Sequence, residues 1–438
     1  MVAIHKENMQ PFVVSAPGKV ILFGEHAVVY GKAAIASSLD MRAYALVAPR
    51  KDGKVRLFLP DVDVDVILDA DALARVDVGV LSHPTEIETL VPEAIEIPEG
   101  PGRMAVLAFV YIYCGVLADA GGRGVGGFTV CVRSLLPVGS GLGSSAALNV
   151  TLATALLRLR GCIGPDVVNP EDKQLVNEWA FRGEQVAHGT PSGIDNSVST
   201  YGGFVQYTKG QTPINLASTR ALNVLITNTN VPKSTKALVA GVRVLRDKFP
   251  AVIDPLLESI HGISIRAAEL FQTTDARIDE LEAQLRDIIG LNHGILATLG
   301  VSHPSLERIR EITAAGDLAS KLTGAGGGGC ALTLVPQSES GSKTESKVVA
   351  DLENEGFHCF RTAVGGPGVS IAYGVGADTV ERWIGTMLER HMSLVPSSHS
   401  SGGNATRATG DDKYAGIVSG FSILPVSVMA MLAPQRKL

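Results

Sequence analysis

The sequence predicts an α+β protein with two domains, residues 1–225 and 226–395, followed by a tail at 396–438. Its 438 residues are enough for two or three domains of ordinary size. Short β-branched runs alternate with helix-forming segments as far as residue 228, and several amphipathic helices follow before strands return. A Ser/Gly-rich stretch at 397–403 then separates the tail from the second domain.

The composition is that of a soluble globular protein and excludes several functional classes. Hydrophobic residues make up 45% of the chain and charged residues 19%, so general disorder is not expected. A formal net charge of −6 argues against a nucleic-acid-binding protein, which usually carries a basic stripe. The five cysteines include no Cys-x-x-Cys pair, and the N-terminus does not resemble a secretory signal. We therefore expect reduced thiols, a cytoplasmic location and no cysteine-bound metal.

The first predicted elements are strands. Apolar, β-branched runs at 12–16 and 19–24 predict two strands joined by a turn at Pro17–Gly18. Runs at 42–48 and 54–59 flank a Lys-Asp-Gly-Lys segment and predict a hairpin.

Two further patterns superficially match ligand-binding motifs, and both are better explained structurally. The aspartates within 61–65 alternate with valines, but Val66 stands where a calcium loop requires glycine, so an exposed edge strand is expected. The glycines at 122, 124 and 127 have the spacing of a dinucleotide fingerprint. However, a predicted buried helix at 103–119 precedes them and a strand follows, which reverses the required order. A plain helix-to-strand loop is therefore expected there.

The glycine-rich stretch 137–146 is the strongest functional signal in the chain. A β-prone run at 128–133 leads into it and helix-forming residues 146–159 follow it, so it connects a strand to a helix. Glycines at alternate positions let the backbone approach a bulky anion, and the helix N-terminus directs N–H groups and positive dipole charge at that anion. We therefore expect a phosphate cradle formed by Pro137, Gly139, Ser140, Gly141, Leu142, Gly143, Ser144, Ser145 and Ala146.

The rest of the chain is expected to contain helices and strands in turn. Asn169, Pro170 and the two acids that follow predict a helix start, and that helix should run to His188. The later predicted elements are, in order, a helical turn after Asp195, strands at 203–208 and 222–228, several helices across 234–315, a strand at 330–335, a helix at 345–353, strands at 357–363 and 369–375, and a helix at 379–391.

The C-terminal tail differs from the rest of the chain. Residues 415–433 are apolar and uncharged, and their length approaches the roughly 20 residues that span a bilayer. Gly416, Gly420 and Pro425 weaken a membrane-spanning helix. An extension outside the two domains is therefore the main interpretation, and membrane contact is the alternative.

Four side chains match the requirements of phosphoryl transfer from a nucleotide. Such a reaction needs a phosphate cradle, a divalent metal, a group that positions the acceptor hydroxyl, and positive charge near the transferred group. Ser145 and Glu184 offer the hard oxygen ligands that Mg²⁺ prefers. Asp195 can reach an acceptor hydroxyl, and Lys19 can keep that carboxylate ionised and stabilise a developing alkoxide. Taken singly, each residue is also compatible with a surface or helix-capping role.

Together these segments resemble the GHMP small-molecule kinases, and the chain contains neither a P-loop nor the protein-kinase motifs. Three ordered motifs carry the resemblance: Pro-Gly-Lys-Val-Ile-Leu-Phe-Gly-Glu-His-Ala-Val-Val-Tyr-Gly at 17–31, the stretch 137–146, and Lys-Leu-Thr-Gly-Ala-Gly-Gly-Gly-Gly-Cys at 321–330. Within that superfamily, the first motif and the segments at 179–200 and 228–235 are similar to the eukaryotic type of the mevalonate kinase family.

The resemblance covers residues 11–376 and implies both a fold and a reaction. The implied fold has an N-terminal domain like the second domain of ribosomal protein S5 and a ferredoxin-like C-terminal domain with extra helices. The implied reaction is the ATP-dependent phosphorylation of the 5-hydroxyl of (R)-mevalonate in isoprenoid and sterol synthesis. Mg²⁺ is the implied metal, and a homodimer is the implied assembly.

The resemblance also implies a role for each matching residue. Asp195 is the expected base or orienting carboxylate, and Lys19 is its partner. Ser145 and Glu184 are expected to hold Mg²⁺, and Ser144 to contact the phosphates. The residues expected beside the acceptor are Glu25, His26 and Thr235, and those expected to close over the site are Gly324, Ala325, Gly326, Gly327 and Gly328.

Two alternatives stay open on the sequence alone. One is another GHMP kinase with a different acceptor, such as phosphomevalonate or a sugar. The other is a non-catalytic ATP-binding regulator on the same fold, against which the presence of Lys19, Glu184 and Asp195 argues.

Overall fold

The computed structural model describes residues 10–373, except 74, 82, 93–94, 119–125, 138, 166–168, 217–219 and 274–276. The glycines at 122 and 124, the helix expected at 379–391 and the C-terminal tail lie outside the described residues. Within the described part of the chain, no helix is long and apolar enough to cross a membrane.

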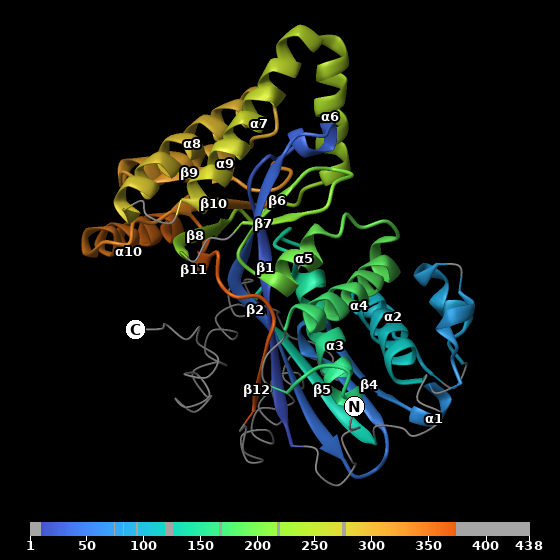
Figure 1. Cartoon of the computed structure of the whole chain (residues 1–438). Helices are drawn as coiled ribbons and strands as arrows, with labels where there is room; N and C mark the ends of the chain where they lie inside the picture. Colours follow the sequence, from blue (N-terminus) through green and yellow to red (C-terminus); the bar gives the residue numbers. More distant parts are fainter. Residues whose placement is uncertain are drawn as a thin grey trace, which may run out of the picture.

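The described strands form one twelve-stranded sheet, drawn in Figure 1. They are β1 (Phe12–Phe23), β2 (Ala34–Arg50), β3 (Val55–Leu59), β4 (Val64–Leu68), β5 (Gly127–Ser134), β6 (Phe204–Tyr207), β7 (Ile214–Leu216), β8 (Leu222–Asn228), β9 (Ala319–Leu322), β10 (Cys330–Leu334), β11 (His358–Val364) and β12 (Ser370–Tyr373). The main order is β4-β3-β5-β2-β11-β8-β10-β9. In addition, β1 pairs with β2 and β12, and β6 pairs with β2 and β7. Only β3 and β5 pair in parallel among these described strands.

The helices gather in two groups along the long strands β1 and β2 (Figure 1). The α-helices are α1 (Ala70–Leu73), α2 (Arg103–Tyr113), α3 (Ser144–Arg160), α4 (Pro170–His188), α5 (Ile194–Tyr201), α6 (Thr235–Lys248), α7 (Pro250–Gln272), α8 (Ile278–Thr298), α9 (Pro304–Ala315) and α10 (Glu339–Asn354). Shorter turns are η1 (Ala27–Tyr30), η2 (Pro60–Val62), η3 (Val78–Val80), η4 (Pro84–Thr89) and the π-helical η5 (Cys114–Ala118). Figure 1 shows α2–α5 beside β1 and β5, whereas α8–α10 lie beside β8–β11 and α6 and α7 lie at the other end of β1 and β2. This mixture of sheet and helices confirms the predicted α+β class.

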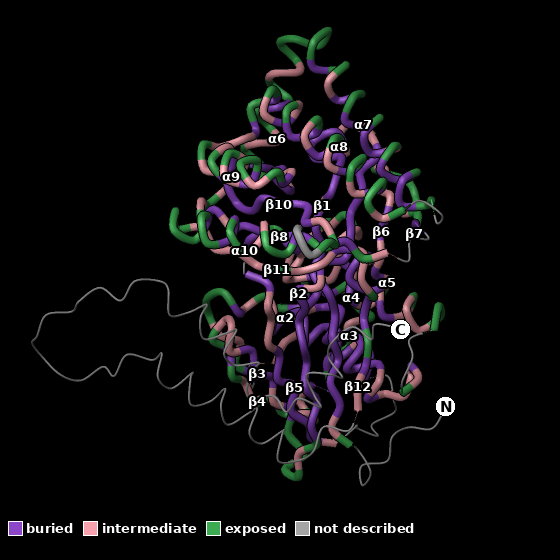
Figure 2. Tube along the Cα trace, turned by 90° about the vertical axis from the view of Figure 1, so that its left-hand side faces the viewer, coloured by how far each residue is buried: buried purple, intermediate pink, exposed green. Residues whose placement is uncertain are grey.

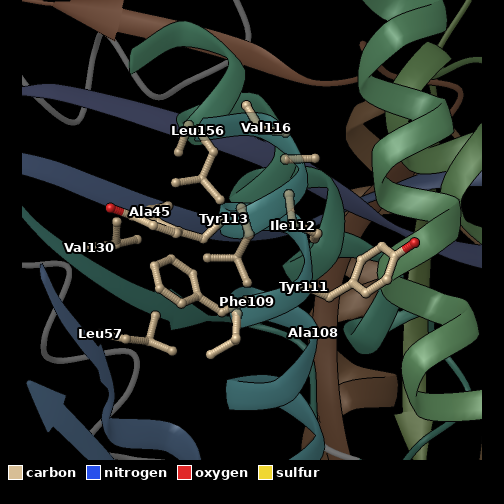
Figure 3. Packing of buried hydrophobic residues seen from close by; sticks show 14 of the residues in the cluster. Ala45, Leu57, Ala108, Phe109, Tyr111, Ile112, Tyr113, Val116, Val130 and Leu156 are labelled. Atoms are coloured by element: carbon tan, nitrogen blue, oxygen red, sulfur yellow. The ribbon is translucent and has the colours of Figure 1, made fainter. Parts of the chain in front are cut away.

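Buried positions follow the strands, and exposed positions lie mostly on the outer helices and turns (Figure 2). The predicted buried helix at 103–119 is present as α2 and its continuation η5. Figure 3 shows Phe109 and Tyr113 of α2 beside Leu57 and Val130 of the sheet. Because α2 is apolar on all sides, it is covered by the sheet, α3 and α4 together.

The predicted turn at Pro17–Gly18 is wrong, because β1 is one strand that passes through these residues. A shift in register with β2 occurs between Pro17 and Gly18, which is the signature of a bulge. The unpaired residues are Asp40 and Met41 of β2, because Pro17 pairs with Arg42 and Gly18 with Leu39. Lys19 of β1 follows this register shift directly.

The hairpin predicted from 42–48 and 54–59 is also wrong. The first run belongs to β2, which is 17 residues long, and β5 lies between β2 and β3 in the sheet. The local Lys-Asp-Gly-Lys turn is real, but long-range pairing with β5 decides which strands are neighbours. The edge strand expected at 61–65 is confirmed only from Val64 on, where β4 begins, pairs with β3 and ends the described sheet order. Pro60–Val62 form the turn η2 instead, and Asp63 is left-handed with φ 59°. The predicted domain boundary at 225 falls inside β8 and stays a prediction.

Candidate active site

The stretch 137–146 connects β5 to α3, as predicted, and its last three residues, Ser144 to Ala146, already belong to α3. Gly143 precedes α3 in a left-handed conformation with φ 76°, and no side chain caps the helix there. A methyl group at Gly143 would lie 3.1 Å from Cβ of Lys19, so the close approach of the two segments requires glycine. Ser144 and Ser145 therefore lie inside the first turn of α3 and do not cap it. The N-terminal N–H groups of α3 are available to an anion.

The loop is attached directly to β1. The backbone N–H of Lys19 donates to the carbonyl of Leu142 at 2.8 Å. Within the loop, the hydroxyl of Ser140 donates to the carbonyl of Pro137 at 2.8 Å. Leu142 and Ala146 are buried beneath the loop, and Gly139 and Gly141 are exposed. The exposed backbone of the phosphate loop therefore lies beside the backbone of Lys19, at the base of the lysine side chain.

Lys19 and Asp195 form an ion pair, with 3.0 Å between Nζ and Oδ1. The lysine side chain is only 8% exposed, whereas the aspartate side chain is 38% exposed, so Asp195 presents the open side of the pair. Asp195 lies in the first turn of α5, and Ser199 of the same helix donates to the carbonyl of Pro17 at 2.7 Å. The contact between β1 and α5 therefore brings together two residues that are far apart in sequence.

Glu184 and Ser145 also meet, as predicted. The hydroxyl of Ser145 donates to Oε1 of Glu184 at 2.6 Å, and Nδ2 of Asn149 donates to the same oxygen at 2.7 Å. Glu184 is buried at 5% exposure on α4, one turn before His188. The sequence analysis did not assign Asn149, although its place one turn after Ser145 on α3 is the signal that could have identified it. The pair offers two hard oxygen ligands, a donor set that fits Mg²⁺.

Lys233 is a second cation of the site that the sequence analysis did not assign. A methyl group added at Gly141 would lie 3.4 Å from its Nζ, and one added at Gly324 would lie 3.7 Å from it. Lys233 therefore lies between the phosphate loop and the C-terminal glycine segment. Desolvation lowers the pKa of Lys233, and the nearby positive charge of Lys19 lowers this pKa further. The sequence signal that could have identified Lys233 is its position after Pro232, between β8 and α6.

The glycine segment 324–329 connects β9 to β10 and is anchored by its backbone. The N–H of Gly327 donates to the carbonyl of Val301 at 2.8 Å, and the N–H of Gly329 donates to the carbonyl of Val231 at 3.2 Å. Its approach to Lys233 agrees with the expectation that this segment lies over the site.

The three residues expected beside the acceptor are found in different surroundings. Glu25 is fully buried, and its side chain pairs with Lys321 rather than facing the Lys19–Asp195 pair. His26 is buried with φ 62°, and its Nε2 donates to the carbonyl of Ala325 at 2.9 Å, since a carbonyl can only accept. Burial lowers the pKa of His26 and favours the neutral ring. Thr235 is exposed at the start of α6, and its predicted contact with the acceptor stays a prediction.

Comparisons with known proteins agree with this architecture. Two family models match the chain, the GHMP kinases N terminal domain at residues 108–203 and the GHMP kinases C terminal domain at 278–354. The mevalonate kinase of Mus musculus is 42% identical over 384 residues, which cover 82% of this chain and 95% of that protein. The mevalonate kinase of Arabidopsis thaliana is 37% identical over 385 residues, covering 82% and 98%. The crystal structure of L. major mevalonate kinase in complex with R-mevalonate has a TM-score of 0.59 at 25% identity and covers 81% of this chain and 95% of that one.

The fold, the paired glycine segments and the Lys19–Asp195 pair define a small-molecule kinase of the GHMP class. The similarity to the two mevalonate kinases extends over most of each chain, so the assignment can be narrowed from the GHMP class to one family. The chain belongs to the mevalonate kinase family.

Proposed function

We propose that this protein transfers the γ-phosphoryl group of ATP to the 5-hydroxyl of (R)-mevalonate, forming 5-phosphomevalonate for isoprenoid and sterol synthesis. The observation that carries the proposal is the Lys19–Asp195 ion pair, which lies against the phosphate loop at Leu142. Membership of the mevalonate kinase family supports the choice of acceptor.

The chain's own residues supply positioning and charge. The N-terminal N–H groups of α3 and the exposed loop backbone hold the phosphates. Asp195 accepts a hydrogen bond from the acceptor hydroxyl and orients it, and it takes the proton as the new P–O bond forms. Because the transition state of phosphoryl transfer is loose, little proton transfer is required early, and orientation is the larger part of this role. Lys19 and Lys233 oppose the negative charge that is spread over the transferred group.

We propose that Ser145 and Glu184 hold Mg²⁺ together with the phosphates of ATP. The proposal is supported by their contact and by their oxygen chemistry. Two protein ligands suffice, because Mg²⁺ usually retains several waters and phosphate oxygens. When bound, the ion neutralises phosphate charge and aligns the phosphates. We also propose that the protein is a homodimer, from the family resemblance, and that it is cytoplasmic, from the cysteine composition. Size-exclusion chromatography with light scattering would test the dimer.

The first test is a coupled assay that measures ADP production by the purified full chain. With ATP, Mg²⁺ and (R)-mevalonate we expect turnover on the order of 1–10³ s⁻¹, the common range for enzymes. Phosphomevalonate and a panel of sugars are the comparison acceptors, and none should approach the kcat/KM of mevalonate. Turnover with one of these acceptors and none with mevalonate would contradict the proposed substrate.

Removing the negative charge of Glu184 should lower the affinity of the site for Mg²⁺. For Glu184→Gln we expect the Mg²⁺ concentration that gives half-maximal rate to rise by about 10-fold or more, since a metal ligand has lost its charge. The measurement is a Mg²⁺ titration of the initial rate at saturating ATP and mevalonate. Glu178→Gln, an exposed position on the same helix, is the matched control. An unchanged Mg²⁺ requirement in Glu184→Gln would exclude Glu184 as a ligand.

A further inference from the structure

A buried ion pair joins the first and third motifs of the chain. Lys321 of β9 binds Oε1 of Glu25, and Nδ2 of Asn292 donates to Oε2 of the same carboxylate at 3.1 Å. The ammonium of Lys321 also donates to the carbonyl of Leu322 at 2.7 Å and lies 5.9 Å from the ring centre of Phe23. The side chains of Glu25 and Lys321 are 0% and 1% exposed. Both charges are therefore removed from solvent and are paired with each other.

This burial separates Glu25 from the open part of the site. Both of its carboxylate oxygens already have a donor, and no part of its side chain is accessible. Asp195, in contrast, is 38% exposed and has its free side toward solvent. A substrate hydroxyl can reach Asp195 without disturbing the fold, but it could reach Glu25 only if a buried ion pair opened, which is costly.

The residues that follow Lys321 also contact the first motif of the chain. Thr323 donates to the carbonyl of Ile21 at 2.8 Å, and the carbonyl of Ala325 accepts from His26. Residues 321, 323 and 325 thus all contact the end of β1 and the turn after it. Gly324, between them, lies in a turn with a left-handed φ of 75°, and a methyl group added to it would lie 3.7 Å from Nζ of Lys233.

We propose that Glu25 and Lys321 are positioning residues for phosphoryl transfer. Their ion pair fixes the glycine segment 324–329 against Lys233 and the phosphate loop, and Glu25 does not bind the acceptor. The inference rests on the proposed kinase function and refines the site residues that perform it. The ion pair differs from the other contacts between the two motifs. The contacts of Thr323 and Ala325 are single hydrogen bonds, and the loss of either one leaves no unpaired buried charge.

Single and double variants of the Glu25–Lys321 pair can distinguish a positioning role from a substrate-binding role. Neutralising one partner leaves the other as an uncompensated buried charge, whereas neutralising both leaves two uncharged groups of similar shape. If the pair positions the glycine segment, the double variant should therefore recover what either single variant loses. If Glu25 bound the acceptor, changing Lys321 as well could not restore the lost contact.

The experiment compares Glu25→Gln, Lys321→Met and the double variant Glu25→Gln/Lys321→Met in the full chain. We expect kcat of each folded single variant to fall by about 10-fold or more, because a small displacement of the glycine segment 324–329 strongly lowers the rate. The KM for mevalonate should stay within about 3-fold of wild type, because no substrate contact is removed. The double variant should return to within about 3-fold of the wild-type kcat with an unchanged KM.

The control is Asp65→Asn, which breaks the ion pair between Arg56 and Asp65 at the β4 edge and should leave kcat unchanged. Folding of every variant is checked by thermal melting. A double variant whose KM for mevalonate is raised about 10-fold, or folded single variants with wild-type kcat, would overturn the proposal. If the single variants do not fold, the KM and kcat of the double variant still decide it. A failure of the proposed function is seen separately, as a wild-type protein without mevalonate-dependent ADP production.

Discussion

Replacing Asp195 with alanine is expected to lower kcat by roughly 10²–10⁴-fold, the range supplied by a positioned acid or base. The variant removes the only carboxylate that pairs with Lys19 among the described residues, and it removes the group that orients the acceptor hydroxyl. The phosphate loop contacts Lys19 through its backbone N–H, which the substitution does not change. ATP binding should therefore be largely retained.

The measurement is kcat from the coupled assay together with ATP affinity from calorimetry. Ser192→Ala, an exposed position in the loop before α5, is the control and should keep wild-type turnover. A thermal melt checks that Lys19, left without its carboxylate, has not destabilised the protein. Asp195→Ala with wild-type kcat would exclude the assigned role, and loss of ATP binding in a folded variant would make Asp195 part of the nucleotide site.

Replacing Lys233 with methionine should have the second largest effect, a loss of about 10²–10³-fold in kcat. Methionine keeps most of the volume between the two glycine segments but removes the charge that opposes the transferred phosphoryl group. Since charge matters most in the transition state, KM for mevalonate should change little. Lys236→Met, at an exposed position on α6, controls for the loss of a surface charge and should be unaffected.

The pH profile provides a second readout for Lys233. Its lowered pKa means that the charged form is present at low and neutral pH and is lost as pH rises, earlier than for an ordinary lysine. The rate of the wild-type protein should therefore decline on the alkaline side. Lys233→Arg should move this decline to higher pH, because a guanidinium stays charged. An identical alkaline limb in Lys233→Arg would show that another group causes it.

The predicted site rests on a local pattern and on family motifs. The phosphate loop was recognisable because glycine spacing, a preceding strand and a following helix all act within a short stretch of chain. The contacts between Ser145 and Glu184 and between Lys19 and Asp195 followed from chemical requirements and family motifs and are present in the structure.

The features that were missed depend on long-range packing. The insertion of β5 between β2 and β3 cannot be deduced from a local turn, because pairing with a distant strand decides it. The burial of Glu25 beside Lys321 joins residues 296 positions apart, and Lys233 becomes a site residue only because two glycine segments converge on it. For Glu25 and Lys233, tertiary contacts thus give a charged residue surroundings that its own sequence neighbourhood does not specify.

The contacts of Lys321, Thr323 and Ala325 with the first motif make the length of this segment as important as its composition. One residue more or fewer between Lys321 and Ala325 would displace at least one of these contacts, and it would move Gly324, with its left-handed φ of 75°, from its place beside Lys233. Substitutions preserve this order, whereas a change of length does not. Single-residue insertions and deletions should therefore be excluded from natural and engineered variants of this segment, even where replacement of an individual side chain is tolerated.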